Sequence, residues 1–550
     1  MNAFLDLLLA DSLTRLVFFP ALACLPLLFL ARAGDKVVKI YGLVVSLVEL
    51  VLILVYVGGH SAAAWVTGPV RDLAANGKPL DWIPSYGIRY DLGMDGISMP
   101  LVVLTGILLP LVLLGSWKGI EKHWHGFTLS LLLLTTGILG ALLALDLFLF
   151  YIFWEVMLIP MYLLIGIWGG QRRIYAAVKF FLFTMAGSLL MLVGILWLAW
   201  TYHGLAGSWS FAYEDLLRLQ IPMREQALLF GAFALAFAIK VPMFPLHTWL
   251  PDAHVEAPTG GSVILAGILL KMGTYGFLRF ALPMFPQASA KYAPLLAGLA
   301  LVGILYGALV AWVQTDMKKL VAYSSVAHLG FVMLGLLAFD LTAWQGALLQ
   351  MINHGLSTGA LFLLVGMIYE RRHTKELAQF GGLAKVMPWY AFFLVFATLA
   401  SVGLPGLNGF AGEFLILVGS YASRGAATRG FAIAAAFGVV LAALYLLKML
   451  QETLWGPLRH EENRGLADLS IREKLILAPL CVLMLWIGVA PETFLAPSRP
   501  ALASTLAAYS QRLAEPAAAS PGLRPPAVGR AAAFGGLATD AGQVAEEPKP

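Results

Sequence analysis

Apolar stretches of about twenty residues recur along almost the whole sequence, and this feature constrains the fold more than any other. An α-helix rises about 1.5 Å per residue, so each stretch is long enough to cross the ~30 Å hydrocarbon layer of a membrane. The composition agrees, with 60% hydrophobic residues, 12% charged residues and a mean hydropathy of +0.82. The sequence therefore predicts an all-α integral membrane protein and excludes an ordinary soluble domain.

We expect about fourteen transmembrane helices, two of them interrupted. Their predicted ranges are 13–31, 36–57, 97–117, 126–145, 146–168, 175–201, 225–253, 260–283, 293–315, 319–339, 342–369, 386–421, 428–455 and 471–495. Pro242 and Pro245 interrupt the seventh, and the sequence GLPGLNG at 403–409 interrupts the twelfth. Because proline removes a backbone donor and clashes with the preceding turn, both are predicted to be broken helices. Broken helices at corresponding positions are typical of two inverted structural repeats.

Six ionisable side chains lie near the middle of separate apolar segments, and we call them the proton row: Glu155, Lys240, Lys271, His328, His354 and Glu413. A charge at the bilayer centre costs about 2.5–3.5 kcal/mol on insertion scales. Burial lowers the pKa of a lysine and raises that of a glutamate, while histidine titrates near neutrality. A row of such groups at one depth can pass protons through intervening water. We therefore interpret all six as proton-transfer residues.

Taken singly, each residue of the row has a simpler explanation. A buried glutamate or lysine can belong to an ion pair between helices, and a lone histidine is commonly a hydrogen-bonded core residue. Six at similar depth favour transport over these explanations. Outside the row, structural pairing is expected for Glu49 and snorkelling for Lys448. His247 and His254 can shape a water entrance, although helix capping by neighbouring residues explains that region nearly as well.

The sequence offers no expected site for a cofactor or a metal. The two cysteines, Cys24 and Cys481, lie in separate apolar segments, without a CxxC pair or a Cys/His cluster. Gly-rich phosphate loops and dinucleotide fingerprints are also missing from the sequence. Any redox chemistry is therefore expected on another polypeptide. The net charge of +5 comes from basic residues in short loops, which does not indicate nucleic-acid binding.

The loop charges predict the orientation, because cytoplasmic loops are rich in lysine and arginine. Loops after odd-numbered spans carry Arg32, Lys36, Lys39, Lys118, Lys122, Arg172, Arg173, Lys318, Lys319, Arg371, Arg372, Lys375, Arg459 and Arg464. Loops after even-numbered spans are poorer in such residues. We expect odd loops in the cytoplasm, both termini outside, and residues 60–95 as an external loop packed on the membrane face.

The segment 238–259, AIKVPMFPLHTWLPDAHVEAPT, closely resembles the antiporter-like membrane subunits of respiratory complex I. The sequence LAGILLKMG at 265–273 is similar to the next helix of that family. YSSVAH at 323–328 and NHGL at 353–356 resemble its two later histidine helices, and FWE at 153–155 resembles its fifth-helix acid. The resemblance covers about residues 1–495. A glutamate in GFAGE at 409–413, where related subunits tend to carry lysine, resembles the subunit M branch.

The resemblance implies a proton-translocating membrane-arm subunit of NADH:quinone oxidoreductase, in a bacterial cytoplasmic membrane. It implies that Glu155 and Lys240 form a controlling pair, that Lys271, His328 and His354 form the central relay, and that Glu413 is the terminal group. FMN, iron–sulfur clusters and quinone are expected on other subunits. Expected partners are other membrane-arm subunits, including two antiporter-like neighbours, together with lipid, protons and water.

The predicted domains follow from the breaks and the resemblance. Residues 1–125 form a three-helix region with the external loop, 126–283 and 293–455 are the two antiporter-like repeats, and 456–495 hold the final helix. The Ala/Pro-rich residues 496–550 depart from the family pattern and are expected to be a disordered tail. Two alternatives stay open. One is a subunit of a cation/proton antiporter or membrane-bound hydrogenase, and the other is a passive membrane scaffold with structural charges.

Overall fold

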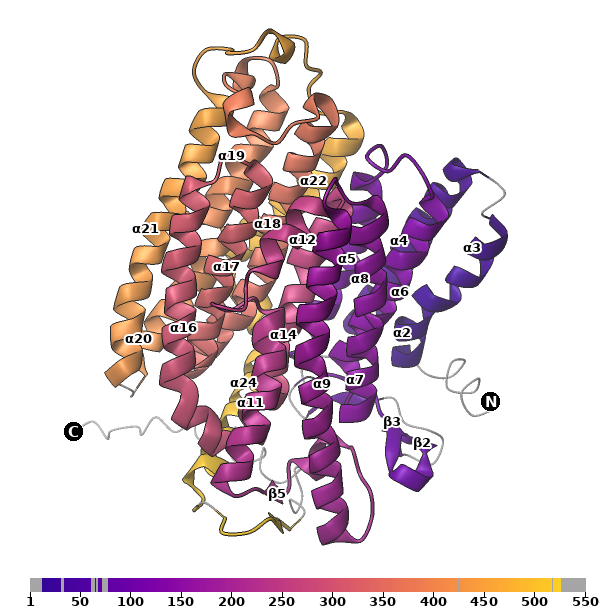
Figure 1. Cartoon of the computed structure of the whole chain (residues 1–550), viewed down its shortest axis with the longest axis vertical. Coiled ribbons are helices and arrows are strands. Elements are labelled where there is room, and N and C mark those ends of the chain that lie inside the picture. The colour runs from indigo at the N-terminus through magenta and orange to yellow at the C-terminus, as the bar shows by residue number, and fades with distance from the viewer. Residues whose placement is uncertain are drawn as a thin grey trace, which may run out of the picture.

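The computed structural model describes residues 12–30, 34–60, 65, 68–71, 78–423, 426–516 and 518–525. The long helices run roughly side by side along the long axis of the molecule and form one elongated bundle (Figure 1). The predicted all-α membrane fold is confirmed, since ten helices or runs of helices are long and apolar enough to cross a membrane within these residues. The full number of spans stays a prediction.

Each predicted range contains one helix or a run of consecutive helices. The N-terminal part has α2 (Ser12–Leu22), α3 (Cys24–Leu30), α4 (Asp35–Gly59), α5 (Met99–Gly115), α6 (Trp124–Leu143), α7 (Leu147–Val156), α8 (Leu158–Trp168), α9 (Arg173–Ala206) and α10 (Tyr213–Leu216). The middle has α11 (Met223–Lys240), α12 (Trp249–Glu256), α13 (Thr259–Ile264), α14 (Leu270–Gly276), α15 (Leu282–Met284), α16 (Pro286–Val313), α17 (Met317–Leu336) and α18 (Leu341–Arg372). The last part has α19 (Pro388–Val402), α20 (Asn408–Ala422), α21 (Ala426–Leu454), α22 (Ile471–Val489), α23 (Glu492–Leu495) and α24 (Arg499–Ala514).

Both predicted helix breaks are present. Residues 241–248 separate α11 from α12, and residues 403–407 separate α19 from α20. In the second break Gly403 and Gly406 have φ angles of +84° and +91°, which L-residues with a side chain rarely adopt. The glycines of the GLPGLNG sequence therefore permit the chain to turn between the two half-helices.

The eighth predicted span contains two π-helical segments that the sequence did not indicate. They are η3 (Leu265–Leu269) and η4 (Phe277–Ala281), and they flank α14 on either side. Single π turns widen a helix and are frequent at functional sites. Lys271 of the proton row lies on the α14 segment between them.

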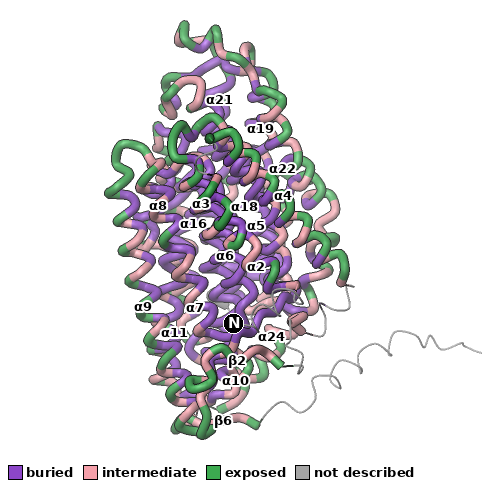
Figure 2. Tube along the Cα trace, turned by 90° about the vertical axis from the view of Figure 1, so that its right-hand side faces the viewer, coloured by how far each residue is buried: buried purple, intermediate pink, exposed green. Residues whose placement is uncertain are grey.

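Burial divides the bundle into a centre and a periphery. The most apolar windows of 259–284 and of α18 are 100% buried, whereas those of α4 and α9 are 33% and 39% buried. Buried residues fill the inside of the bundle and exposed ones lie at its ends and on outward faces (Figure 2). A helix buried on every face lies at the bundle centre, so two helices of the proton row occupy the interior.

Short antiparallel strands lie at one end of the bundle, which we call the hairpin end (Figure 1). The pairs are β1 (Val70–Arg71) with β4 (Gly93–Met94), β2 (Leu80–Ile83) with β3 (Ile88–Tyr90), and β5 (Leu219–Gln220) with β6 (Gly522–Leu523). The β2–β3 hairpin is held to the bundle where the Arg89 backbone N–H donates to Asp146 Oδ2 at 3.1 Å. The described part of the 60–95 loop is therefore packed against the helices.

The prediction of a disordered tail at 496–550 is wrong for residues 499–516 and 518–525. Helix α24 occupies 499–514, with Leu502 fully buried and Tyr509 2% exposed. The Tyr509 ring stacks on Phe339, with centroids 4.6 Å apart. The prediction missed this helix because it used composition alone. Apolar residues at helical spacing supply a packing face within the Ala-rich sequence, and composition does not record that spacing. Residues 526–550 lie outside the described part of the chain.

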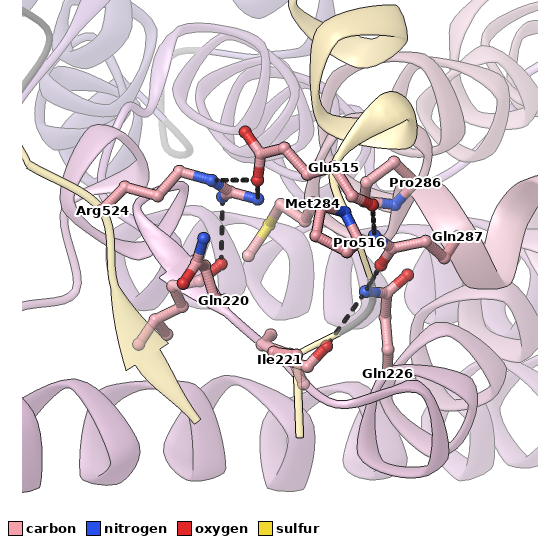
Figure 3. Close-up of a pocket in the computed structure, with 11 residues that line it drawn as sticks. Gln220, Ile221, Gln226, Met284, Pro286, Gln287, Glu515, Pro516 and Arg524 are labelled. Carbon is pink, nitrogen blue, oxygen red and sulfur yellow. Dashed lines mark hydrogen bonds and ion pairs between the residues drawn. The ribbon is translucent and has the colours of Figure 1, made fainter. Parts of the chain in front are cut away.

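The segment after α24 is fastened back onto the hairpin end of the bundle (Figure 3). Arg524 Nη2 lies 2.6 Å from Glu515 Oε2, and Arg524 Nη1 donates to Leu219 O at 3.2 Å. Gln287 Nε2 donates to Glu515 O at 3.3 Å, and Gln226 Nε2 donates to Gln287 Oε1 at 2.6 Å. These residues line a small polar pocket between the C-terminal segment and the α11 and α16 ends.

Candidate proton-transfer site

Four of the six proton-row residues meet in the centre of the bundle. Lys271 lies on α14, His354 on α18, His328 on α17 and Glu413 on α20. All four residues are buried, at 0–3% exposure of the whole residue. They come from positions 142 residues apart in sequence, so only the helix packing brings them together.

Lys271 and His354 form the first pair. The Lys271 Nζ lies 2.6 Å from His354 Nδ1 and also donates to the backbone carbonyl of Ala266 in η3. A protonated amine has three donors and no acceptor, so His354 Nδ1 is the natural acceptor of the lysine proton. The other ring nitrogen, His354 Nε2, is buried and has no hydrogen-bond partner among the described residues.

His328 and Glu413 form the second pair. His328 Nδ1 lies 2.7 Å from Glu413 Oε1, and both side chains are 4% exposed. The rings of His328 and His354 have centroids 5.9 Å apart and are tilted by 60°. That separation is too long for a direct ring-to-ring hydrogen bond in this geometry but short enough for one bridging water. The two pairs therefore form one row across α14, α18, α17 and α20.

Uncharged polar residues extend the row beyond Glu413. Gln350 Nε2 donates to Glu413 Oε1 at 3.0 Å, and Asn353 Nδ2 donates to Gln350 Oε1 at 3.1 Å. Asn353 Nδ2 also donates to Asn408 O at 2.7 Å, at the start of α20 beside the helix break. Buried amide oxygens of Asn353 and Asn408 have no partner among the described residues. Such oxygens can hold water, so this network connects Glu413 with the break.

Sequence reasoning missed these amides because it searched only for ionisable groups. Gln350 and Asn353 precede His354 on a largely apolar helix, and this clustering was a usable signal. Tyr445, whose hydroxyl lies 3.4 Å from His328 Nε2, was also missed. No local pattern marks it, since α21 contacts α17 only through the fold.

Glu155 and Lys240 stand apart from the other four. Lys240 is the last residue of α11, is 2% exposed, and has its Nζ 5.2 Å from the Trp154 ring centroid and 5.6 Å from that of Phe180. Glu155 on α7 is close enough to act on the Lys240 charge. One Glu155 carboxylate oxygen is buried without a hydrogen-bond partner in the described structure. A lysine in this setting is held by aromatic faces and one nearby carboxylate.

The helices of Lys240 and Lys271 nevertheless touch. A Cβ on Gly273 of α14 would lie 2.7 Å from Phe237 O and 2.8 Å from the Val241 backbone nitrogen. Only glycine permits this approach, because backbone atoms cannot yield as a flexible side chain can. Among the described residues no hydrogen bond links Lys240 to Lys271, so the two parts of the row meet by packing alone.

The two histidines beside the first break are buried. His254 is fully buried, neither of its ring nitrogens has a hydrogen-bond partner in the described part of the chain, and it stacks on Phe362 with centroids 4.6 Å apart. His247 is 4% exposed, with Nδ1 unpartnered. At the C-terminal end of α12, the carbonyl of Ala257 accepts from Lys318 Nζ at 2.5 Å and that of Val255 accepts from Lys375 Nζ at 3.1 Å. Cations at a helix C-terminus stabilise its dipole, so both lysines cap α12.

The predictions for Lys448 and Glu49, which lie outside the row, compare differently with the structure. Lys448 Nζ donates to Trp312 O at 2.8 Å at an exposed position, in line with snorkelling. Glu49 is fully buried on α4, and neither carboxylate oxygen has a hydrogen-bond partner among the described residues. The expected structural partner of Glu49 is therefore missing from the described contacts.

The described residues contain no group of three or more His, Cys, Asp and Glu side chains that could hold a metal ion. Both cysteines are buried and unpaired.

Residues 144–441 match the model of the family described as NADH:quinone oxidoreductase/Mrp antiporter, TM. The chain is 45% identical to NADH-quinone oxidoreductase subunit M of Escherichia coli strain K12 over 77% of this chain and 84% of that protein. It is 44% identical to the Rhodobacter capsulatus subunit M over 88% of this chain and 94% of that protein.

Solved structures give the same result. The chain is similar to a chain of respiratory complex I from Thermus thermophilus, with 34% identity, a TM-score of 0.76 and coverage of 89% of this chain and 99% of that one. A chain of the Mrp complex from a Dietzia species, at 22% identity and a TM-score of 0.75, shares the fold over 91% of this chain and 99% of its own length.

Proposed function

Since the chain belongs to the NADH:quinone oxidoreductase/Mrp antiporter family, as a proton-translocating membrane subunit of NADH:quinone oxidoreductase, we propose that the proton row is its proton path. The observation that carries the proposal is the row of short contacts in the centre of the bundle. Lys271 Nζ is 2.6 Å from His354 Nδ1, and His328 Nδ1 is 2.7 Å from Glu413 Oε1.

The chemistry of each group suits one step of the transfer. Lys271 gives a proton to His354 Nδ1, and the imidazole can release a proton from Nε2 because its two nitrogens alternate as donor and acceptor. A bridging water carries the proton to His328. Glu413 then accepts it and is the terminal group, beside the amide network that reaches the second helix break.

Glu155 and Lys240 act as the controlling pair in this proposal. Two unit charges 4 Å apart interact by about 4 kcal/mol at an effective dielectric of 20, which equals roughly three pKa units. A change in the distance between Glu155 and Lys240 therefore changes how tightly Lys240 holds its proton. The contact between α11 and α14 at Gly273 supports transmission of that change toward Lys271.

The wider setting belongs to the proposal too. The two antiporter-like repeats are 126–283 and 293–455, each containing one broken helix. The redox cofactors FMN, iron–sulfur clusters and quinone are bound by other subunits, and this chain carries no redox site. Its neighbours in the membrane arm include two antiporter-like subunits. The complex lies in the bacterial cytoplasmic membrane with both termini of this chain outside.

The test replaces Lys271 by methionine, which is similar in length and cannot carry a proton. Complex containing Lys271→Met is reconstituted into proteoliposomes, and proton uptake per electron transferred is measured beside assembly on native gels. The ratio is expected to fall severalfold in assembled complex. Lys448→Met is the matched control, because Lys448 lies on a spanning helix outside the row, and it should pump normally. Normal pumping by Lys271→Met would contradict the proposal that protons pass along the row.

A further inference from the structure

A buried ion pair joins Asp95 to Arg279, which lies on the same helical run as Lys271, toward the hairpin end. Arg279 Nη2 is 2.5 Å from Asp95 Oδ1, and the two residues are 7% and 4% exposed. Arg279 lies in η4 and Asp95 in the segment just before α5. Burying a charge away from water costs free energy unless the charge has an opposite charge beside it and is hydrogen-bonded. Arg279 and Asp95 meet both conditions.

Arg279 is the last of three polar residues that follow one another along this helix from Lys271, which we call the polar column: Lys271, Tyr275 and Arg279. Tyr275 is four residues after Lys271 and Arg279 is four residues after Tyr275, so all three lie near one face of the helix. Arg279 Nε donates to the Tyr275 hydroxyl at 3.3 Å. Without a barrier, this column would offer a proton on Lys271 a second route, toward the hairpin end instead of along the histidines.

The hydrogen bonds in the column run in directions that stop proton transfer. The Tyr275 hydroxyl donates to the backbone carbonyl of Leu142 at 2.9 Å, and a carbonyl has no proton to pass on. A guanidinium has five donors and no acceptor and does not lose its proton in proteins. Arg279 therefore cannot take a proton from Tyr275, and the hopping chain is interrupted at this residue.

The surrounding contacts keep the guanidinium in place. Asp95 Oδ1 also accepts from the backbone N–H groups of Ile97 at 3.0 Å and Ser98 at 3.1 Å, which fixes the carboxylate. The hydroxyl of Tyr213 donates to Arg279 O at 2.6 Å, which fixes the backbone of η4 from a different segment. Residues from four separate parts of the chain thus hold one donor-only group across the column.

We propose that Asp95 and Arg279 form a seal that closes the hairpin end of the Lys271 helix to protons. Given the proposed role of Lys271, the seal leaves the histidine row as the path by which its proton departs. Arg279 is the blocking group and Asp95 is the positioning residue that holds it.

The experiment measures passive proton leak in the whole complex without turnover. Proteoliposomes receive no NADH, a potassium diffusion potential is applied with valinomycin, and a pH-sensitive dye inside reports proton uptake. The variant Asp95→Asn with Arg279→Gln removes both charges, keeps similar side-chain sizes, and replaces the donor-only cation with amides that can hydrogen-bond a proton-carrying water. A severalfold faster uptake than in the native complex is expected. Uptake at the native rate would overturn the proposal.

Two further variants separate a seal from general loosening. Adding Lys271→Met to the double variant should restore the native leak rate, because the leak requires protons on Lys271. A leak that persists without Lys271 would show a structural defect and overturn the seal. The control Arg499→Gln with Glu492→Gln removes an exposed ion pair of 2.8 Å and should leave the membrane tight.

If the double variant does not assemble, the leak is measured with Arg279→Gln alone. Asp95 can then be buried in its neutral, protonated form, which needs no positively charged partner. This single variant should leak in the same Lys271-dependent way. Failure of this inference is distinct from failure of the proposed function, because the first is read from passive leak and the second from coupled pumping by Lys271→Met.

Discussion

Lys240 and Lys271 are both buried lysines of the proton row, and their surroundings differ. Lys271 is in hydrogen-bond contact with a base, His354, and can transfer a proton at once. Lys240 faces the aromatic rings of Trp154 and Phe180, which stabilise a charge but accept no proton. The structure therefore supports a relay role for Lys271 and a controlling, charge-holding role for Lys240.

Substitution of Lys240 tests that division. Lys240→Ala is expected to assemble and to lose most of its coupled proton uptake in proteoliposomes. Lys240→Arg should also be impaired, because a guanidinium keeps its charge but cannot release its proton in the useful pH range. Lys474→Ala is the matched control, since Lys474 Nζ also lies over a ring, that of Trp389 at 4.3 Å, outside the row. Native pumping by Lys240→Arg would argue for a fixed structural charge.

At this scale the sequence predicted which residues to examine but not how they connect. The six residues were recognisable because charge in an apolar segment is costly whatever surrounds it. The contact of Lys271 with His354 joins residues 83 positions apart, and no local pattern contains it. The amides of Gln350 and Asn353 cost less to bury than charges do, so their role depended on the contacts that the structure shows.

At the scale of elements, proline and glycine made both helix breaks predictable, because their backbone effects act locally. The π-helical segments around Lys271 were not predicted from the sequence. Helix α24 was missed as well. Its composition resembles that of a disordered tail, while its stability comes from a few apolar side chains that meet the rest of the bundle.

Tyr509 is expected to hold α24 on the bundle. Tyr509→Ala removes a buried ring that stacks on Phe339, and truncation of a buried aromatic side chain costs about 3–5 kcal/mol. Limited proteolysis should then cut the segment around 515–525 much faster than in the native complex. Tyr86→Ala, at a 59% exposed tyrosine, is the control and should not change the cleavage. Equal cleavage of the two variants would contradict the docking of α24.

For the whole molecule, the orientation is the largest prediction still to be measured. The end of α18 and the end of α9 lie at opposite ends of the bundle (Figure 1). His373→Cys should react with an impermeant thiol reagent only from the cytoplasmic side, and Ser208→Cys only from outside. Both positions are next to exposed helix ends, and the native cysteines are buried. The reverse labelling pattern would invert the predicted topology.

The central part of the proton row depends on the whole bundle, because α14, α17, α18 and α20 together bring four of its six residues into one line. Glu413 is where that line ends, held by His328 at 2.7 Å and Gln350 at 3.0 Å. A terminal group must accept a proton from the row and then lose it to water, which a carboxylate can do and an amide cannot. The proposal that protons cross this subunit along the row therefore depends most directly on Glu413.

The most direct measurement is proton uptake per electron transferred in proteoliposomes containing Glu413→Gln. The variant keeps the size of the side chain and should assemble, yet its ratio should fall well below that of the native complex. Glu413→Asp should retain part of the ratio, and Glu492→Gln, at an exposed glutamate, should retain all of it. Full pumping by Glu413→Gln would contradict the account and leave Glu413 as a packing residue.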